Sequence, residues 1–491
     1  MEQRIHENLN AEIASGTIHT LSDCVGYLSW TYFSRRVKKN PKYYGAESSS
    51  PEHVEARFFD FVKETIATLR LEGCVEIQGL DDFSEINPTF LGIAASQYYL
   101  CHRTPKQMLV GIREARKITL RAMKNDIDEI DRSKLASVEG TSQPFNRPKH
   151  VDEPSIAWLL FALCSTHEFD ELPVRHNEEH LNEDLSKNVM WGPDVADVIS
   201  GNKTLQRQYR NPEIYLDPHT KAFLLVQAHL KFTKLPISDY VNDTKSVMEN
   251  LPRILAAMSY IAAAASECEV EGSFELLTQF SRTRQLLRAR CKVDDDPLVQ
   301  LPGFSTSIVQ RLQNGKQNHR ATTLLSLRLL QRKDAEQQIQ KVLNDSSRQR
   351  IDEAVNALYG FPLVALTKSV TYFEVDEGTN KTRGKLIISI NLDRLNPQSS
   401  RHTSTTTSKD NANSFTLTIL LGSYEQRFLL SSSSVRISRC GNWSIQKELS
   451  FDWQKAKSDG NGENVIVRLL IDEVRGLDSE MIVRLNTKKN Q

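Results

Sequence analysis

The sequence predicts a multidomain α+β protein that is mostly helical up to about residue 360 and all-β beyond it. Two observations support this prediction. Apolar residues recur at intervals of three and four through the first part, which is typical of amphipathic helices. After Pro362 the apolar period falls to two, which is typical of strands. A chain of 491 residues is also long enough to form several hydrophobic cores.

Composition argues against several classes of protein. Hydrophobic residues make up 39% of the chain and charged residues 25%, as in an ordinary globular protein. The seven cysteines are scattered, so buried thiols in a reducing compartment are favoured over disulfides or zinc. The charged N-terminus predicts no signal peptide, and apolar runs such as Ile261–Ala265 are too short to span a membrane. We expect a nuclear or cytoplasmic protein with no membrane partner.

The formal net charge of zero conceals two strongly charged segments. Residues 282–333 contain eleven Lys and Arg and three Asp, whereas residues 168–184 contain seven acids and one Arg. A polyanion would bind the first segment and avoid the second. The alternative is that the basic run is simply a solvated face.

Residues 1–90 have the order of a winged helix. Leu21–Arg36 and Val54–Leu71 carry apolar residues at helical spacing, Gly73 is typical of a helix stop, and Cys74–Gln78 reads as a short strand. Such a domain binds nucleic acid or merely packs against its neighbours.

Residues 91–292 are expected to form a helical bundle. Asp217 followed by Pro218 is a strong helix start, because the Asp caps the helix and the Pro pre-sets its first turn. An insertion is expected at about 112–155, and its part from 133 to 155 contains Gly, Ser and three prolines, which favour a loop.

One helix of this bundle, Thr244–Ala265, carries a candidate site. Its apolar residues form a buried stripe, while Arg253 and Tyr260 lie two helical turns apart on a second face. A cation and an aromatic ring on one line can hold a phosphate and stack a base. They could equally be a snorkelling Arg and a half-buried Tyr. Pro252 must kink this helix or mark its first turn.

Two further arginines extend the candidate site into the basic segment. Arg284 and Arg288 are four residues apart on one helix face, so they repel each other unless an anion or an acid lies between them. Residues 293–360 are expected to form a small, basic helix-loop-helix domain.

Residues 361–491 are expected to form an immunoglobulin-like or fibronectin-like β-sandwich. About seven alternating segments indicate strands, which is the strand number of such a sandwich. Ser399–Ser414 is polar low-complexity sequence and reads as a loop inside this domain.

Motifs of catalysis are missing. Gly201–Thr204 resembles the end of a P-loop but lacks the adjacent Gly-Lys and the preceding strand, so no ATP site is expected in this chain. His176 and His180 share a helix face as zinc ligands would, but Asn177 stands where a zincin has Glu and no third ligand is evident. We therefore expect no catalytic, cofactor or metal site.

Several segments, taken in order, match the motifs of one known family. They are Leu28–Phe33, Arg35–Arg36, Asn40–Tyr44, Leu172–Glu178, Asp217–Lys221, Leu224–Leu230, Leu301–Pro302 and Gly476–Asp478. Together they resemble the Sec sixty-three homology unit of large superfamily-two (DExH) RNA helicases. Residues 172–182 are more similar to the helicase of the activating signal cointegrator complex than to the spliceosomal U-five particle helicase.

The resemblance implies a non-catalytic module of an ATP-dependent helicase. It implies that Thr244–Ala265 is the ratchet helix along which a single strand of RNA or DNA runs, with Arg253 at the position of the ratchet arginine and Tyr260 near the stacking aromatic. Pro252 and Cys291 depart from the family pattern, in which Trp usually occupies the latter position. ATP and magnesium would be needed only by motor domains, supplied in cis or in trans. Protein subunits of an RNA-processing or ribosome-quality-control complex are the other implied partners.

Two hypotheses of different classes remain at this point. In the first, the chain guides single-stranded nucleic acid past Arg253, Tyr260, Arg284 and Arg288. In the second, it is a protein-interaction scaffold that makes no nucleic-acid contact, with the sandwich as its docking surface.

Overall fold

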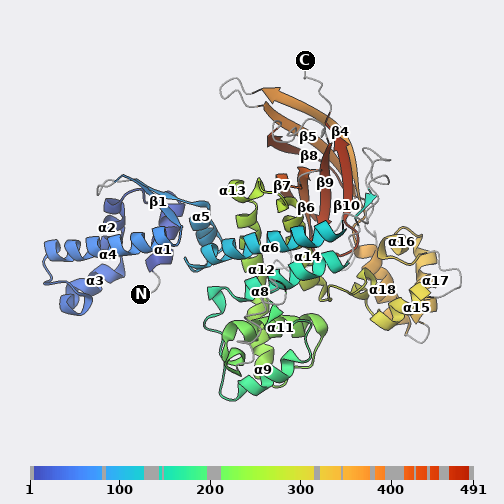
Figure 1. Ribbon diagram of the computed structural model, residues 1–491, viewed down its shortest axis with the longest axis horizontal. Helices are drawn as coiled ribbons and strands as arrows, with labels where there is room; N and C mark the ends of the chain where they lie inside the picture. The colour runs from blue at the N-terminus through green and yellow to red at the C-terminus, as the bar shows by residue number, and fades with distance from the viewer. Residues whose placement is uncertain are drawn as a thin grey trace, which may run out of the picture.

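The chain forms an elongated molecule with a helical domain at each end, a helical bundle between them and two β-sheets on one side (Figure 1). No helix in the described part of the chain is long and apolar enough to cross a bilayer. The computed structural model describes residues 5–79, 85–126, 143–145, 149–195, 199, 212–314, 321–343, 347–375, 382–392, 414–424, 427–438, 443–452 and 464–485.

The N-terminal domain packs its helices around a core of its own, and a two-stranded antiparallel hairpin closes it. The single helix expected over Leu21–Arg36 is wrong, because Thr31 adopts an extended conformation and its hydroxyl donates to the Leu28 carbonyl at 2.7 Å. The elements are α1 (Ile5–Ala14), α2 (Leu21–Trp30), α3 (Tyr32–Lys39), a 3-10 helix (Pro41–Tyr44), α4 (Pro51–Leu71), β1 (Val75–Gln78) and β2 (Glu85–Pro88).

The central bundle buries a continuous apolar core between its long helices. The predicted helix start is confirmed, since the Asp217 carboxylate accepts from the Thr220 backbone N–H at 2.8 Å. The helices are α5 (Phe90–Gln97), α6 (Thr104–Asp126), α8 (Lys149–Cys164), α9 (Glu178–Ser186), α11 (Pro218–Lys231), α12 (Asp239–Ala262), α13 (Ala265–Cys268) and α14 (Ser273–Ala289), with 3-10 turns at His167–Phe169 and Pro212–Leu216.

Helix α12 is the predicted site helix, and Pro252 lies in its interior. The alternative that Pro252 marks a first turn is therefore wrong, because the helix already begins at Asp239. Proline has no N–H to donate to the carbonyl four residues earlier, which is that of Met248. The ladder of helical hydrogen bonds is thus interrupted in the middle of α12.

The loop expected over 133–155 is wrong at two places. Gln143–Pro144 forms a short strand, β3, that pairs with Ser479 and Glu480, and α8 already begins at Lys149. Residues 127–142 and 146–148 of the expected insertion lie outside the described part. The sequence could not show β3, because two residues have no period and only the partner strand defines them.

The C-terminal part consists of two antiparallel sheets that pack around a shared core, with strand orders β3-β10-β9-β6-β7 and β4-β5-β8. All seven expected strands are present, although Trp453 and residues 399–413 of the expected loop lie outside the described part. The strands are β4 (Val364–Val375), β5 (Thr382–Leu392), β6 (Ser414–Ser423), β7 (Leu429–Ser438), β8 (Trp443–Asp452), β9 (Asn464–Ile471) and β10 (Ser479–Arg484).

A small helical unit shares the core of the two sheets. The sequence pattern did not predict one of its helices, α17. Most residues of this helix are polar or charged, and its buried residues are only Ala335, Ile339 and Leu343. Its elements are a 3-10 turn (Pro297–Gln300), α15 (Thr306–Asn314), α16 (Leu324–Arg328), α17 (Arg332–Leu343) and α18 (Arg348–Gly360).

Buried ion pairs join α14 of the bundle to the five-stranded sheet. The Arg468 guanidinium on β9 is 2% exposed and lies 2.7 Å from Glu275 on α14 and 2.7 Å from Glu480 on β10. Gln285 on α14 donates to Asp478 at 2.9 Å. Because such charges are costly to bury unpaired, these contacts fix where the sheet sits on the bundle.

Candidate nucleic-acid interface

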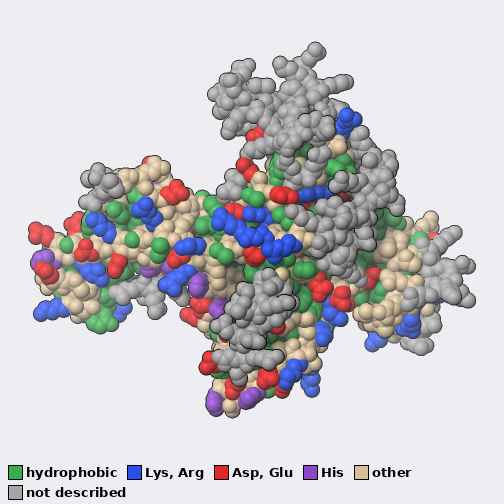
Figure 2. Space-filling view, viewed as in Figure 1, with side chains coloured by type: hydrophobic (Ala, Val, Ile, Leu, Met, Phe, Trp, Pro, Cys, Tyr) green, Lys and Arg blue, Asp and Glu red, His purple; other side chains and the backbone are tan. Residues whose placement is uncertain are grey.

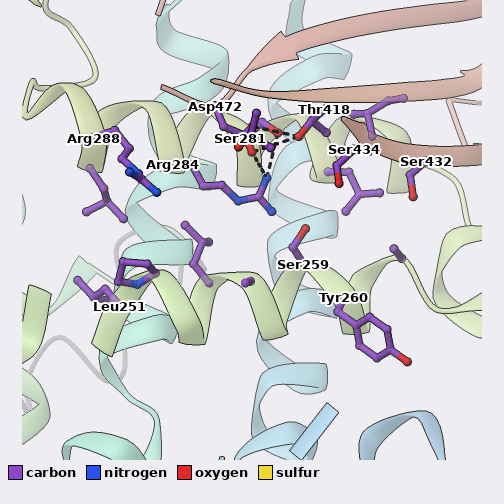
Figure 3. A pocket seen from close by; sticks show the side chains of 18 of the residues that line it. Leu251, Ser259, Tyr260, Ser281, Arg284, Arg288, Thr418, Ser432, Ser434 and Asp472 are labelled. Atoms are coloured by element: carbon purple, nitrogen blue, oxygen red, sulfur yellow. Dashed lines mark hydrogen bonds and ion pairs between the residues drawn. The ribbon is translucent and has the colours of Figure 1, made fainter. Parts of the chain in front are cut away.

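A groove of about 970 Å³ lies where α12, α14 and the outer face of the five-stranded sheet meet. Figure 3 shows α12 along one side of it and the sheet strands along the other, with α14 between. Leu251, Leu255 and Leu277 make part of its lining apolar. The volume is at the upper end of the range of ligand pockets, about 300–1,000 Å³.

The sheet side of the groove is polar because of the register between β6 and β7. Thr416 pairs with Arg436 and Thr418 pairs with Ser434, and all four residues line the groove. Side chains alternate along a strand, so the polar ones face outward while Ile437 is buried in the core between the sheets. The part of this face that lines the groove offers hydroxyl groups and the exposed cation Arg436.

Arg284 lines the groove, but its charge is paired with an acid of the protein itself. Its guanidinium lies 3.1 Å from the Asp472 carboxylate, which also accepts from the Thr418 hydroxyl at 3.1 Å (Figure 3). Burial raises the pKa of Asp472, while Arg284 and the hydroxyl of Thr418 act to lower it. Of the two alternatives, an anion or an acid beside the arginines, the structure thus has an acid at Arg284, and this side chain connects α14 to the residue that follows β9.

Arg288 lies one turn further along α14, is exposed and lines the same groove. Within the described residues it makes no ion pair or hydrogen bond, in contrast to most other cations of the basic segment. Arg282 pairs with Asp478 at 3.1 Å, and Arg290 lies 4.1 Å above the Phe232 ring. Many cations of the basic segment thus stabilise the fold. Arg288 has no such contact, although its charge acts to lower the pKa of the Glu473 carboxyl, which burial raises.

Arg253 and Tyr260 are both in contact with Tyr98, at the end of α5. Arg253 donates to the carbonyls of Tyr98, at 2.8 Å, and Tyr99, and the Tyr260 ring lies 5.9 Å from the Tyr98 ring. Tyr99 has a positive φ of 52°, which is not a helical conformation, so α5 cannot continue through it. The carbonyls at this helix end have no partner within the helix, and Arg253 donates to two of them. Arg253 does not line the groove, whereas Tyr260 lies at one end of it and points away from the arginines (Figure 3).

Three of the four predicted site residues thus line one groove: Tyr260, Arg284 and Arg288. Sequence reasoning missed Arg436 and Tyr98. The alternation of β7 places Arg436 on an outer sheet face, but only the packing of that face beside the bundle gives it a role. Tyr98 had no signal of its own in the sequence.

A separate cluster of cations is visible over α6 in the middle of the molecule (Figure 2). Here Arg113 and Arg116 lie 2.7 Å and 3.0 Å from the buried carboxylate of Glu267, and Lys117 lies 3.0 Å from Glu114. Two carboxylates thus offset part of the charge of these three cations, so each of the three already has an acidic partner, in contrast to Arg288.

Two of the segments that resemble the family, Leu172–Glu178 and Asp217–Lys221, stabilise the fold. Lys221, from Asp217–Lys221, is fully buried and lies 2.6 Å from Glu178 and 2.7 Å from Asp243. Arg175 binds the same two acids at 3.0 Å and 2.8 Å. The neighbouring His180 is 79% exposed, and no cluster of three metal-ligating side chains in the described residues includes it.

Comparison with known proteins agrees with this architecture. The Sec63 Brl domain matches residues 140–484. The chain belongs to this family. A winged helix-turn-helix domain of the SNRNP200 type matches residues 1–79, which confirms the winged helix.

Two of the three relatives of this Sec63 Brl domain chain described next are helicases by name. DExH-box ATP-dependent RNA helicase DExH14 of Arabidopsis thaliana is 35% identical over 54% of this chain and 10% of its own length. Activating signal cointegrator 1 complex subunit 3 of Homo sapiens is 34% identical over 53% of the chain and 9% of its own. RQC trigger complex helicase SLH1 of Saccharomyces cerevisiae is 32% identical over 61% of this chain and 12% of its own length. The match therefore spans only about a tenth of these proteins.

Proposed function

We propose that this chain is the non-catalytic Sec63 unit of an ATP-dependent RNA helicase, and that the groove between α12, α14 and the five-stranded sheet binds single-stranded nucleic acid. The observation that carries the proposal is the groove itself. It combines exposed cations at Arg288 and Arg436, aromatic rings at Tyr98 and Tyr260, and hydroxyls between them. Cations bind phosphates and aromatic rings stack bases, which together hold a single strand without reading its sequence.

The proposal extends to the organisation of the chain. We divide it into a winged helix at 1–90, a bundle at 91–292, a basic helical unit at 293–360 and an immunoglobulin-like sandwich at 361–491. Motor domains that bind ATP and magnesium act on the same strand, in cis or in trans. Nuclear or cytoplasmic RNA-processing complexes, including those of ribosome quality control, are the proposed setting.

Binding of a labelled oligouridine to the full chain, followed by fluorescence anisotropy at several salt concentrations, tests the proposal. For a single strand, each phosphate that the protein neutralises contributes about 0.7 to the slope of log K against log salt. Arg288→Ala and Arg436→Ala are each expected to lower the slope by that amount. The double variant is expected to weaken binding at least roughly tenfold, since hydrogen bonds to charged groups contribute about 1.5–3 kcal/mol.

The matched control is Lys245→Ala, which removes an exposed cation of α12 that does not line the groove. Tyr260→Ala is expected to weaken binding by the energy of one stacked base, about 1–3 kcal/mol. Arg253 and Arg284 are poor probes, because each stabilises the fold through its own partners. Affinity and salt slope that stay unchanged in the double variant would exclude the groove as the strand path.

A protein-docking scaffold is the alternative, and one observation favours it. Trp30, Tyr32 and Tyr43 of the winged helix are 92%, 61% and 83% exposed, and exposed Trp and Tyr are typical of interface anchors. If the chain binds no nucleic acid, this surface of the winged helix is the better docking candidate than the sheets.

A further inference from the structure

Three side chains with metal-binding atoms meet where the winged helix touches the bundle. Glu7 projects from α1, and Cys101 and His102 lie in the short connection before α6. One ligand atom from each lies within 4.8 Å of the others. The Glu7 Oε1 to His102 Nδ1 distance is 2.9 Å, and the Cys101 Sγ to His102 Nδ1 distance is 3.9 Å.

The surrounding protein holds the connection in place. The Cys101 backbone N–H donates to Glu168 at 3.0 Å, and the Thr104 hydroxyl donates to the other oxygen of the same carboxylate at 3.0 Å. The Cys74 thiol donates to the His102 carbonyl at 3.3 Å. These hydrogen bonds hold the backbone of the connection, whereas the Nε2 atom of His102 is buried and has no hydrogen-bond partner among the described residues.

The His102 ring is also fixed from its flat side. The His6 ring stacks on it at a centroid distance of 4.6 Å and an interplanar angle of 15°. His102 is 5% exposed, so its Nδ1 is presented to Glu7 and Cys101 with little freedom to turn.

The spacing fits a zinc ion after a small adjustment. Zinc binds sulfur at about 2.3 Å and nitrogen or carboxylate oxygen at about 2.0–2.2 Å, so tetrahedral ligands are about 3.3–3.6 Å apart. The distances of 2.9 Å and 3.9 Å bracket this value. The third pair, the Cys101 Sγ atom and the Glu7 oxygen, lies within 4.8 Å, so the side chains must draw closer together to reach one ion.

A cation would also satisfy an unpaired group. The Glu7 Oε2 atom is buried and, among the described residues, has no hydrogen-bond partner. A buried carboxylate oxygen without a donor is costly, and a divalent cation removes that cost if Glu7 binds it through this oxygen, either together with Oε1 or after a rotation of the carboxylate.

We propose that Glu7, Cys101 and His102 bind a zinc ion, with a water in the fourth position, and that this ion pins the winged helix to the bundle. The mixed set of thiolate, imidazole and carboxylate is one that zinc accepts and that magnesium and calcium do not prefer. The sequence analysis missed the site because Glu7 is far from Cys101 and His102 in the chain.

Binding requires that two protons leave, one from the Cys101 thiol and one from His102 Nδ1, which now shares its proton with Glu7. Because these protons must leave, the affinity for zinc should rise with pH.

The test is a titration of the reduced full chain with zinc against a chelating indicator, together with the zinc content after dialysis. We expect one zinc per chain, and a loss of at least tenfold in affinity for Cys101→Ser and His102→Gln. Zinc should raise the melting temperature of the unaltered chain and of the control variants, but not that of Cys101→Ser or His102→Gln. With cobalt in place of zinc, the sulfur-to-metal absorbance band should appear and should vanish in Cys101→Ser.

Two matched controls replace residues of the same types elsewhere. Cys268→Ser removes another partly buried thiol, and His180→Gln removes an exposed imidazole, and both should leave zinc binding unchanged. The proposal is overturned if the unaltered chain retains no stoichiometric zinc, or if Cys101→Ser binds it equally well. A melting temperature that falls in Glu7→Gln but never responds to zinc would show a simple ion pair instead.

Discussion

Replacing the buried Lys221 by Met should destabilise the helical bundle severely. The Lys221 ammonium is 0% exposed and donates to Glu178 at 2.6 Å, to Asp243 at 2.7 Å and to the Pro173 carbonyl at 2.7 Å. Met keeps the volume and most apolar contacts of the lysine stem, so the change isolates the loss of charge.

The expected cost follows from what remains behind. Removing one partner of a buried ion pair costs about 3–5 kcal/mol, because the other charge stays buried. Arg175 still binds both acids, at 3.0 Å and 2.8 Å, so we expect the lower end, about 3 kcal/mol. For a unit of this size that corresponds to a fall in melting temperature of about 6–12 °C.

Thermal unfolding followed by circular dichroism at neutral pH measures this effect. The control is Lys231→Met on the same helix, an exposed lysine that donates to the Asn188 carbonyl, and we expect a cost below about 0.5 kcal/mol. Adding Glu178→Gln and Asp243→Asn to the Met variant should restore part of the stability, because neutral amides are less costly to bury. If the Lys221 and Lys231 variants melt alike, the buried network contributes nothing and the reasoning is refuted.

Three further predictions concern the junctions between units. Arg468→Met should lower the free energy of unfolding by about 3–5 kcal/mol, because the buried Glu275 carboxylate loses its partner. Limited proteolysis should then separate the sheets from the bundle. Gly92→Ala should cost at least about 1–3 kcal/mol in thermal unfolding, because the new methyl group would lie 2.1 Å from the Cys74 carbonyl oxygen. In zinc-free buffer, the stability gained from protonated His102 beside Glu7 is complete below about pH 6.5 and should be lost as pH rises to about 9, as melting curves against pH would show.

Each of these predictions has a control that should behave differently. Arg484→Met lies on the same sheet but is exposed, and should leave the proteolysis pattern unchanged. Gly26→Ala should stabilise by up to about 1 kcal/mol, because it lies inside α2 with open space around it. His102→Gln should remove the alkaline loss of stability. A pH profile that is the same with and without His102 would show that the pair contributes nothing.

Local features of this protein could be predicted from the sequence. The helical period identified α12 and α14, the Asp217–Pro218 pair identified the start of α11, and the change of period after Pro362 identified all seven long strands. These features depend on residues within a few turns or one strand of each other, so a local pattern contains the necessary information. The order of helices and strand in residues 1–90 predicted the winged helix, and the family motifs predicted the Sec63 unit; the comparisons confirm both.

Only the tertiary structure decided what the candidate site residues contact. Arg253 and Tyr260 were correctly placed on one helix, but the partners of Arg253 are carbonyls of Tyr98 and Tyr99, on a different element. Arg284 and Arg288 look alike in the sequence, yet Asp472 engages the first and leaves the second exposed. The reason is physical: the residues of a helix determine which side chains share a face, while charge pairing and burial depend on the distant segments that pack against that face.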